Sequence, residues 1–303
     1  MAIAPPQRLI RALGETAPEG DDWLAGLPEA ARQAVALREL TVERVQVPGG
    51  RSSLVVLVRG ADGAPAVLKL APPRARPEGE RAALAHWAGR GAVLLLEAGS
   101  ADGALVLERL HPDVSVRSLP EAKALLEAAG VLRRLWVEPP SGVVFESVAE
   151  RTGRQAAAMR AGVAAGADAD GALEPLVEAA LAARESLLAA PPERRLLHGT
   201  FRQSKVLAAE RMPWLAVGPD PVVGECAFDL ARLVRDRVED LIGSPSGAAT
   251  TRRRVKRLAE SLEVDQERLR GWTLFRAVES GARALRVGRR GDAELLLEFA
   301  AWL

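Results

Sequence analysis

The local sequence pattern changes about one third of the way along the chain, and this change restricts the fold more than any other feature. Five short runs rich in valine and leucine, separated by turns such as Asp62-Gly63, predict strands at residues 42–47, 54–59, 66–70, 93–96 and 104–107. One helical pattern, at residues 78–90, interrupts these runs between the third and the fourth. A small sheet that carries one helix is therefore expected in the front part of the chain.

The rest of the chain is mainly helical in pattern. Apolar residues recur at helical spacing over residues 121–136, 148–165, 173–189, 228–242, 251–262, 266–287 and 292–302. One or two short helices are also expected in the first forty residues, a flexible connector at 166–171, and strand-like pieces at 206–207 and 214–217. A β-rich front and a helical back predict an α+β protein of two lobes, residues 1–110 and 111–303.

The composition is that of a folded protein and argues against several classes of partner. Of the 303 residues 48% are hydrophobic, and 41 basic residues nearly balance 40 acidic ones. Because the net charge is only +1, no global field favours nucleic acid or an anionic membrane. The chain begins without the apolar core of a signal peptide, no stretch offers the roughly eighteen apolar residues of a membrane helix, and the single Cys226 has no internal disulfide partner. A cytoplasmic location is predicted.

Two features of the front part suggest contact with phosphate. Lys69 lies on the third predicted strand, and Glu80 lies about eleven residues later in the predicted helix. In kinases such a pair holds a lysine in register with the nucleotide phosphates, although a lone lysine on a strand usually faces solvent. Between the first two strands, Gly49, Gly50 and Ser52 could let backbone N–H groups approach phosphate, but a plain hairpin turn explains them equally simply.

Three later segments carry a family resemblance. These are 196–200 (LLHGT), 213–217 (PWLAV) and 224–231 (GECAFDLA), in the order and spacing of one family. From about Leu40 to its end, the chain resembles the aminoglycoside and hydroxyurea antibiotic-resistance kinases, and among them the streptomycin 6-phosphotransferases. The resemblance implies a two-lobed kinase-like fold, with a small five-stranded antiparallel sheet and one helix in the first lobe and a larger helical second lobe. It also implies a nucleotide-side role for Lys69, Glu80, the 48–53 loop and Glu108, which stands at the lobe junction.

The residues that carry phosphotransfer in this family are replaced. The family's catalytic loop reads H-G-D-x-x-x-x-N, but here Thr200 stands in place of the catalytic aspartate and Lys205 in place of the metal-binding asparagine. Gly218 stands in place of the aspartate of I-D-P-K-P, the principal metal ligand. A threonine hydroxyl has no accessible pKa with which to accept a proton, and an ammonium group has no lone pair for a cation. No catalytic residue and no metal ligand is therefore expected to be intact.

Other parts of the family's site are kept or altered. The resemblance assigns His198 and Asp229 to the structural support of the catalytic loop, with Asp229 expected to accept hydrogen bonds from the backbone of His198 and Gly199. Asp220 and Glu225 are candidate replacement metal ligands, although Pro219 and Pro221 resist the necessary shift of the loop.

The new cations allow a further interpretation. Arg202 and Lys205, together with Lys69, could neutralise an anionic ligand without a metal, or Arg202 and Lys205 could simply point to water.

These features predict a pseudokinase that binds a small molecule or a protein partner in the former kinase cleft, in an antibiotic biosynthesis or resistance pathway. Any ATP that binds is expected to bind without magnesium. The alternative is an enzyme that uses the same cleft, either for ATP-dependent phosphotransfer to an aminoglycoside-like hydroxyl or for a recruited reaction other than phosphoryl transfer.

Overall fold

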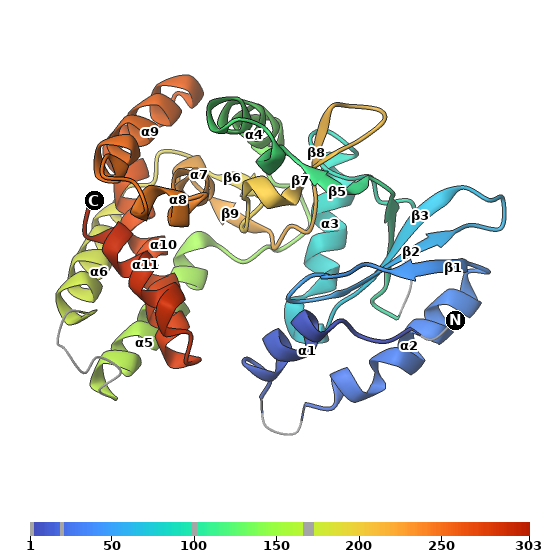
Figure 1. Cartoon of the computed structure of the whole chain (residues 1–303). Coiled ribbons are helices and arrows are strands. Elements are labelled where there is room, and N and C mark those ends of the chain that lie inside the picture. The colour runs from blue at the N-terminus through green and yellow to red at the C-terminus, as the bar shows by residue number, and fades with distance from the viewer. Residues whose placement is uncertain (1–2, 19–20, 98–101, 166–172) are drawn as a thin grey trace. The chain divides into compact units, whose positions relative to one another are not determined.

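The structure is a computed structural model and describes residues 3–18, 21–97, 102–165 and 173–303. The chain forms two compact units (Figure 1). The first comprises Met1–Val116 together with Val206–Asp220, and the second comprises Arg117–Lys205 together with Pro221–Leu303. The chain returns to the first unit for residues 206–220, where it adds two strands. The lobe boundary at residue 110 stays a prediction.

The first unit is built on a four-stranded antiparallel sheet. Its order is β1 (Thr41–Val45), β2 (Leu54–Arg59), β3 (Pro65–Leu70) and β4 (Leu105–Glu108). The unit also contains helices α1 (Gln7–Gly14), α2 (Trp23–Leu37), η1 (Pro73–Ala75) and α3 (Pro77–Trp87), and a second sheet of β5 (His111–Ser115), β7 (Val206–Ala208) and β8 (Trp214–Ala216). Alternate residues of β2 and β3, such as Leu54, Val56 and Leu68, are fully buried and share one core with Leu27 and Ala31 of α2.

The fourth predicted strand of this sheet, at residues 93–96, is not formed as a regular strand. Its backbone instead pairs in two directions, because Val93 N donates to Ala216 O at 2.9 Å while Leu96 N donates to Val106 O at 2.8 Å. Only isolated bridges result, such as Leu95 to Leu107. Val93 is buried but Leu96 is exposed, and the hydrophobic pattern could not reveal that two different partners divide the segment.

The second unit is a helical body with one small two-stranded sheet. Its helices are α4 (Glu121–Leu135), α5 (Val148–Ala164), α6 (Leu173–Ala189), α7 (Cys226–Val234), α8 (Val238–Ile242), α9 (Gly247–Leu262), α10 (Gln266–Arg286) and α11 (Arg290–Ala300). The strands are β6 (Arg195–Leu197) and β9 (Val222–Gly224), and the turns η2 (Val116–Ser118) and η3 (Gln203–Lys205) complete the elements. Helix α10 packs against α5, α6, α7, α9 and α11 (Figure 1).

One predicted helix, residues 228–242, is in fact two helices. Arg237 has a φ of +58°, in the left-handed region that interrupts a right-handed helix. Its guanidinium donates to Gln203 Oε1 at 3.0 Å, Arg117 O at 2.7 Å and Leu119 O at 2.9 Å. These contacts compensate the unusual backbone, and they are too distant in sequence to be visible in the helical pattern. The predicted connector at 166–171 lies outside the described residues.

Every helix in the described ranges is too short or too polar to cross a bilayer.

The single cysteine reports on the folding of the second unit. Cys226 is only 4% exposed, its backbone N–H donates to Glu193 Oε1 at 3.1 Å, and burial raises the pKa of its thiol. Because the thiolate is the reactive form, we expect iodoacetamide at pH 8 to leave Cys226 of the native protein largely unmodified. The same reagent should label it fully in denaturant. Rapid labelling of the native chain, measured by mass spectrometry, would contradict this burial.

Candidate functional site

Lys69 and Glu80 form a buried ion pair in the first unit. Lys69 lies on β3 between Val55 of β2 and Leu105 of β4, and Glu80 lies in the first turns of α3. The ammonium of Lys69 donates to both carboxylate oxygens of Glu80, at 2.5 Å to Oε1. The two side chains are 11% and 7% exposed. A lysine that merely faced solvent would not be held in this way, so the strand and helix position this ammonium group as the sequence led us to expect.

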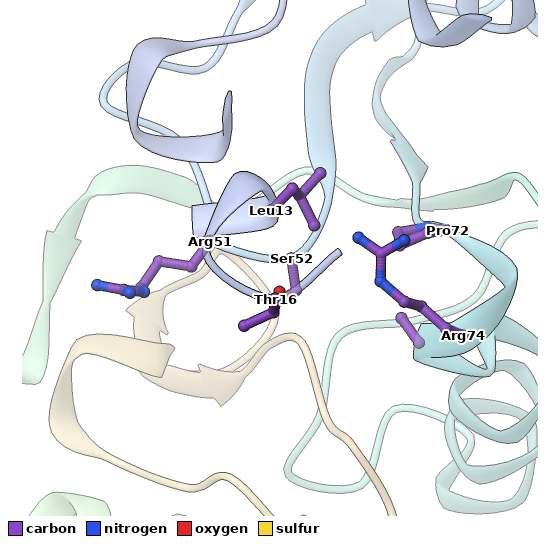
Figure 2. A pocket seen from close by; sticks show the side chains of 7 residues that line it. Leu13, Thr16, Arg51, Ser52, Pro72 and Arg74 are labelled. Carbon is purple, nitrogen blue, oxygen red and sulfur yellow. The ribbon is translucent and has the colours of Figure 1, made fainter. Parts of the chain in front are cut away.

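The loop between β1 and β2 lies against the N-terminal helix. Gly49 has a φ of +74°, and a Cβ at this position would lie 3.0 Å from Pro6 Cγ. Arg51 pairs with Glu15 at 3.0 Å, and Arg74 pairs with Asp21. A cavity of about 250 Å³ is lined by Leu13, Thr16, Arg51, Ser52, Pro72, Arg74 and Ala75 (Figure 2). The loop therefore contacts the chain's own N-terminal residues as well as forming a turn, and a role for Gly49, Gly50 and Ser52 toward phosphate stays a prediction.

Glu108 has a structural task in the first unit. Its carboxylate accepts hydrogen bonds from Leu94 N at 3.0 Å and from Arg211 Nε at 2.9 Å. Arg211 also donates to Gly89 O and Ala92 O, each at 2.7 Å. Arg211, which belongs to the 206–220 segment, therefore links this segment to Glu108 at the end of β4 and to the backbone of Gly89 and Ala92. No local sequence pattern indicates this role of Arg211, because its partners are more than a hundred residues away in the chain.

Asp229 of α7 accepts hydrogen bonds from the backbone of the loop that begins at His198. Both residues are fully buried. Asp229 Oδ2 accepts from His198 N at 2.7 Å, and Oδ1 accepts from Gly199 N at 2.8 Å, so the two hydrogen bonds expected of this aspartate are present. Burial raises the pKa of Asp229, while nearby Arg276 and the two N–H groups act in the opposite direction.

Arg276 of α10 completes this support and was missed by the sequence reasoning. Its guanidinium donates to Phe228 O and to Gly199 O, each at 2.7 Å, and lies 4.1 Å from the centre of the Phe228 ring. An arginine in a helical pattern carries no signal of such contacts. Two helices therefore hold the backbone of this loop, α7 through Asp229 and α10 through Arg276.

The two replaced positions of this loop contact each other. Lys205 Nζ donates to Thr200 Oγ1 at 2.6 Å, and the 3₁₀ turn η3, in which Lys205 N donates to Arg202 O at 2.9 Å, sets their spacing. A hydroxyl that accepts from an ammonium group is a weaker proton acceptor, because the neighbouring positive charge opposes protonation of its oxygen. This pair does not supply a general base, and its role toward an anion stays a prediction.

The positions that would hold magnesium do not fit that ion. Magnesium requires oxygen ligands in an octahedral arrangement, whereas Lys205 offers only donors and Gly218 has no side chain. Gly218, which follows β8 in the first unit, has a φ of +61°, which favours glycine. In the described ranges, no three His, Cys, Asp or Glu side chains are grouped so that they could hold a metal.

Glu225, one of the two candidate replacement ligands, already has other partners. It is 3% exposed. Its oxygens accept from Arg268 Nε at 2.6 Å, Arg268 Nη2 at 2.7 Å and Trp272 Nε1 at 2.6 Å. This network ties the start of α7 to α10, so Glu225 serves the packing of the second unit. Asp220 belongs to the first unit, and its role as a ligand stays a prediction.

Fold and residue pattern together define a protein of the aminoglycoside phosphotransferase class, with an antiparallel N-terminal sheet, a buried Lys–Glu pair and an aspartate-braced loop. Residues 38–288 match the family described as aminoglycoside/hydroxyurea antibiotic resistance kinase, and the chain belongs to that family. It is similar to the streptomycin 6-kinase of Streptomyces glaucescens, with 35% identity over 272 residues that cover 89% of this chain and 86% of the relative. It is also similar to the hydroxyurea phosphotransferase of Kitasatospora aureofaciens, with 37% identity over 269 residues, covering 86% and 74% of the two chains.

Solved structures agree on the fold. The crystal structure of a thermostable mutant of aminoglycoside phosphotransferase APH(4)-Ia, in a ternary complex with ADP and hygromycin B, superimposes with a TM-score of 0.62. It covers 89% of this chain and 96% of its own at 16% identity. Choline kinase LicA from Streptococcus pneumoniae gives a TM-score of 0.60 at 11% identity, covering 91% and 99%. The predicted kinase-like fold is thus confirmed.

Proposed function

We propose that this chain is a pseudokinase of its family, which binds a small molecule or a protein partner through the residues that replace the catalytic set. The observation that carries the proposal is the hydrogen bond from Lys205 Nζ to Thr200 Oγ1 at 2.6 Å. Where the family has an aspartate and an asparagine, this chain has Thr200 and Lys205, and the ammonium group of Lys205 donates a hydrogen bond to the hydroxyl of Thr200. The kept features, Lys69 with Glu80 and Asp229 beneath the loop, support binding and folding without requiring chemistry.

The relatives favour a second candidate function. A streptomycin 6-kinase and a hydroxyurea phosphotransferase are 35% and 37% identical to this chain, and sequences this similar commonly share a reaction class. The second candidate is an enzyme, either ATP-dependent phosphotransfer to an aminoglycoside-like hydroxyl or a recruited non-phosphoryl reaction. The family comparison supports this candidate better than the first. The residues Thr200, Lys205 and Gly218 support the first, and turnover measurements separate the two.

Nucleotide binding gives a first test. Lys69 is still available to contact a phosphate, but the family's magnesium ligands are replaced. We therefore expect ATP to bind weakly, and with the same affinity in the presence of magnesium as in the presence of EDTA. Titration calorimetry measures this directly. Lys69→Ala should weaken the binding further, and Lys123→Ala, an exposed lysine of α4, serves as the matched control and should not. Micromolar ATP binding that disappears in EDTA would instead support the enzyme.

Location and excluded partners remain sequence predictions. The near-neutral charge predicts that neither nucleic acid nor a membrane surface is a partner. The cytoplasmic location is predicted from the lack of a signal-peptide pattern and of a membrane-length apolar stretch in the sequence. An antibiotic biosynthesis or resistance pathway is proposed from the family alone.

A further inference from the structure

The loop between β1 and β2 contacts the N-terminal segment, residues 3–18, at two points in the first unit. Pro6 directly precedes α1 and lies so close to Gly49 that a Cβ on Gly49 would be 3.0 Å from Pro6 Cγ. At the other end of α1, Glu15 Oε2 accepts a hydrogen bond from Arg51 Nη2 at 3.0 Å. Both ends of one short helix therefore contact the same loop.

Apolar residues anchor α1 to the sheet without help from the loop. Leu9 and Leu13, four residues apart and so on one face of α1, are 0% and 4% exposed. They belong to the same core cluster as Leu54, the first residue of β2. Glu15 follows this anchored helix as its C-cap, and its backbone N–H donates to Arg11 O at 3.0 Å. The helix therefore fixes the place from which Glu15 reaches the loop.

The ion pair between Glu15 and Arg51 is of a kind that another anion can replace. The two side chains are 16% and 38% exposed, and ion pairs open to water in this way contribute little to stability because water screens their charges. Glu15 also stands at the C-terminal end of α1, where the helix dipole disfavours a carboxylate. Its carboxylate is therefore not explained by helix stability, and the role that the structure shows for it is to neutralise Arg51.

A cavity lies where the N-terminal segment, the loop and η1 meet. Arg51 and Arg74 both line this cavity of about 250 Å³, and Thr16 and Ser52 lie between them in Figure 2. Arg74, like Arg51, is paired with a carboxylate from the first part of the chain, that of Asp21. Since one water molecule takes up about 30 Å³ in the liquid, the cavity has room for a phosphate group. An oxyanion that enters it competes with the chain's own carboxylates for these arginines.

We propose that the N-terminal segment is an autoinhibitory contact: Glu15 neutralises Arg51 and restrains the loop between β1 and β2, so that a phosphate-bearing ligand must displace this carboxylate in order to bind. A terminal phosphate carries more negative charge than a carboxylate and binds a guanidinium group through paired hydrogen bonds, so it competes effectively for Arg51. The inference rests on the proposed function in one respect, because it requires a ligand of the pseudokinase whose phosphate contacts this loop.

Calorimetric titration of the full-length protein with ATP in EDTA, at constant ionic strength, measures the competition. Glu15→Gln removes the competing charge and should tighten ATP binding about threefold or more, as expected for release of an arginine from a weak surface ion pair. Arg51→Gln removes the cation and should weaken ATP binding. The double variant should bind ATP like Arg51→Gln alone, because the effect of Glu15 acts through Arg51 and the two changes are therefore not additive.

Amide hydrogen exchange of residues 49–53, measured by mass spectrometry without ligand, reports the restraint on the loop directly. Glu15→Gln and Arg51→Gln should each speed this exchange about threefold or more, because either change removes the ion pair. Glu29→Gln is the matched control, since Glu29 of α2 is exposed and pairs with Arg32 at 2.7 Å. It removes the same charge and an ion pair from the same unit, and it should change ATP affinity and exchange by less than about twofold.

The proposal is overturned if Glu15→Gln binds ATP no more tightly than the wild type, a result that includes no binding by either chain. It is also overturned if residues 49–53 of Glu15→Gln exchange at the wild-type rate, or if the double variant keeps the gain in affinity. If Glu15→Gln fails to fold, shown by loss of its melting transition, the exchange rate of Arg51→Gln decides the question. Catalytic turnover by the wild-type chain would overturn the pseudokinase while leaving this contact standing, so the two failures are distinguishable.

Discussion

Purified protein incubated with ATP, magnesium and streptomycin is expected to turn over ATP no faster than about once in several hours. Kinases typically turn over at about 1–100 per second. Loss of a general base lowers the rate by about 10²–10⁴-fold, and loss of magnesium clamping removes several kcal/mol more of transition-state stabilisation. Even with strong non-additivity, rates on the order of hours per turnover remain. Coupled assays over a panel of aminoglycosides, and with hydroxyurea, measure this directly.

Single substitutions should not restore the reaction. Thr200→Asp supplies a carboxylate, but the ammonium of Lys205, which now lies 2.6 Å from Thr200 Oγ1, would pair with it. A new aspartate at 200 would then be a salt-bridged group with a lowered pKa and therefore a poorer base.

The triple variant Thr200→Asp, Lys205→Asn, Gly218→Asp is expected to recover magnesium-dependent ATP binding before it recovers turnover, because it restores oxygen ligands. The left-handed φ of +61° at residue 218 opposes the third change by roughly 1–2 kcal/mol, so some loss of stability is expected too. The variant that keeps Gly218 and carries only the first two changes is the matched control. Robust, magnesium-dependent turnover by the unmodified protein would falsify the pseudokinase and establish the enzyme.

Replacing Asp229 by alanine is expected to destabilise the second unit by about 3–5 kcal/mol, the usual effect of removing one partner from a buried, charged network. The change leaves the backbone N–H groups of His198 and Gly199 without their acceptor and leaves buried Arg276 with a less compensated charge. Since domains are commonly stable by only about 5–15 kcal/mol, a large share of the folding free energy is involved.

Chemical denaturation measures this loss, and alkylation of Cys226 reports it independently. Asp240→Ala, which removes an exposed carboxylate of α8, is the control and should change stability by less than about 0.5 kcal/mol. Asp229→Asn keeps one acceptor oxygen and should lose less than Asp229→Ala. A stability for Asp229→Ala equal to that of the control would mean that the loop is held chiefly by other groups.

The sequence by itself was enough to predict the kinase-like fold and the types of side chain at the candidate site. Hydrophobic periodicity is local, so it located four of the five predicted strands and most of the helices. The family resemblance implied that Asp229 should contact the backbone of His198, as it does. The predicted strand and helix that carry Lys69 and Glu80 led us to expect this pair, and the structure adds that the pair is buried. Residue type alone also predicts that Thr200 is not a general base and that Lys205 is not a magnesium ligand, because these chemical properties belong to the side chains themselves.

Only the tertiary structure decided how distant residues share their hydrogen bonds and charges. It divided the 93–96 segment between two partners, broke the helix at Arg237 by giving its guanidinium acceptors in other segments, and assigned Glu225 to Arg268 and Trp272. These outcomes depend on contacts between residues tens of positions apart, and local sequence patterns hold no information about such distances.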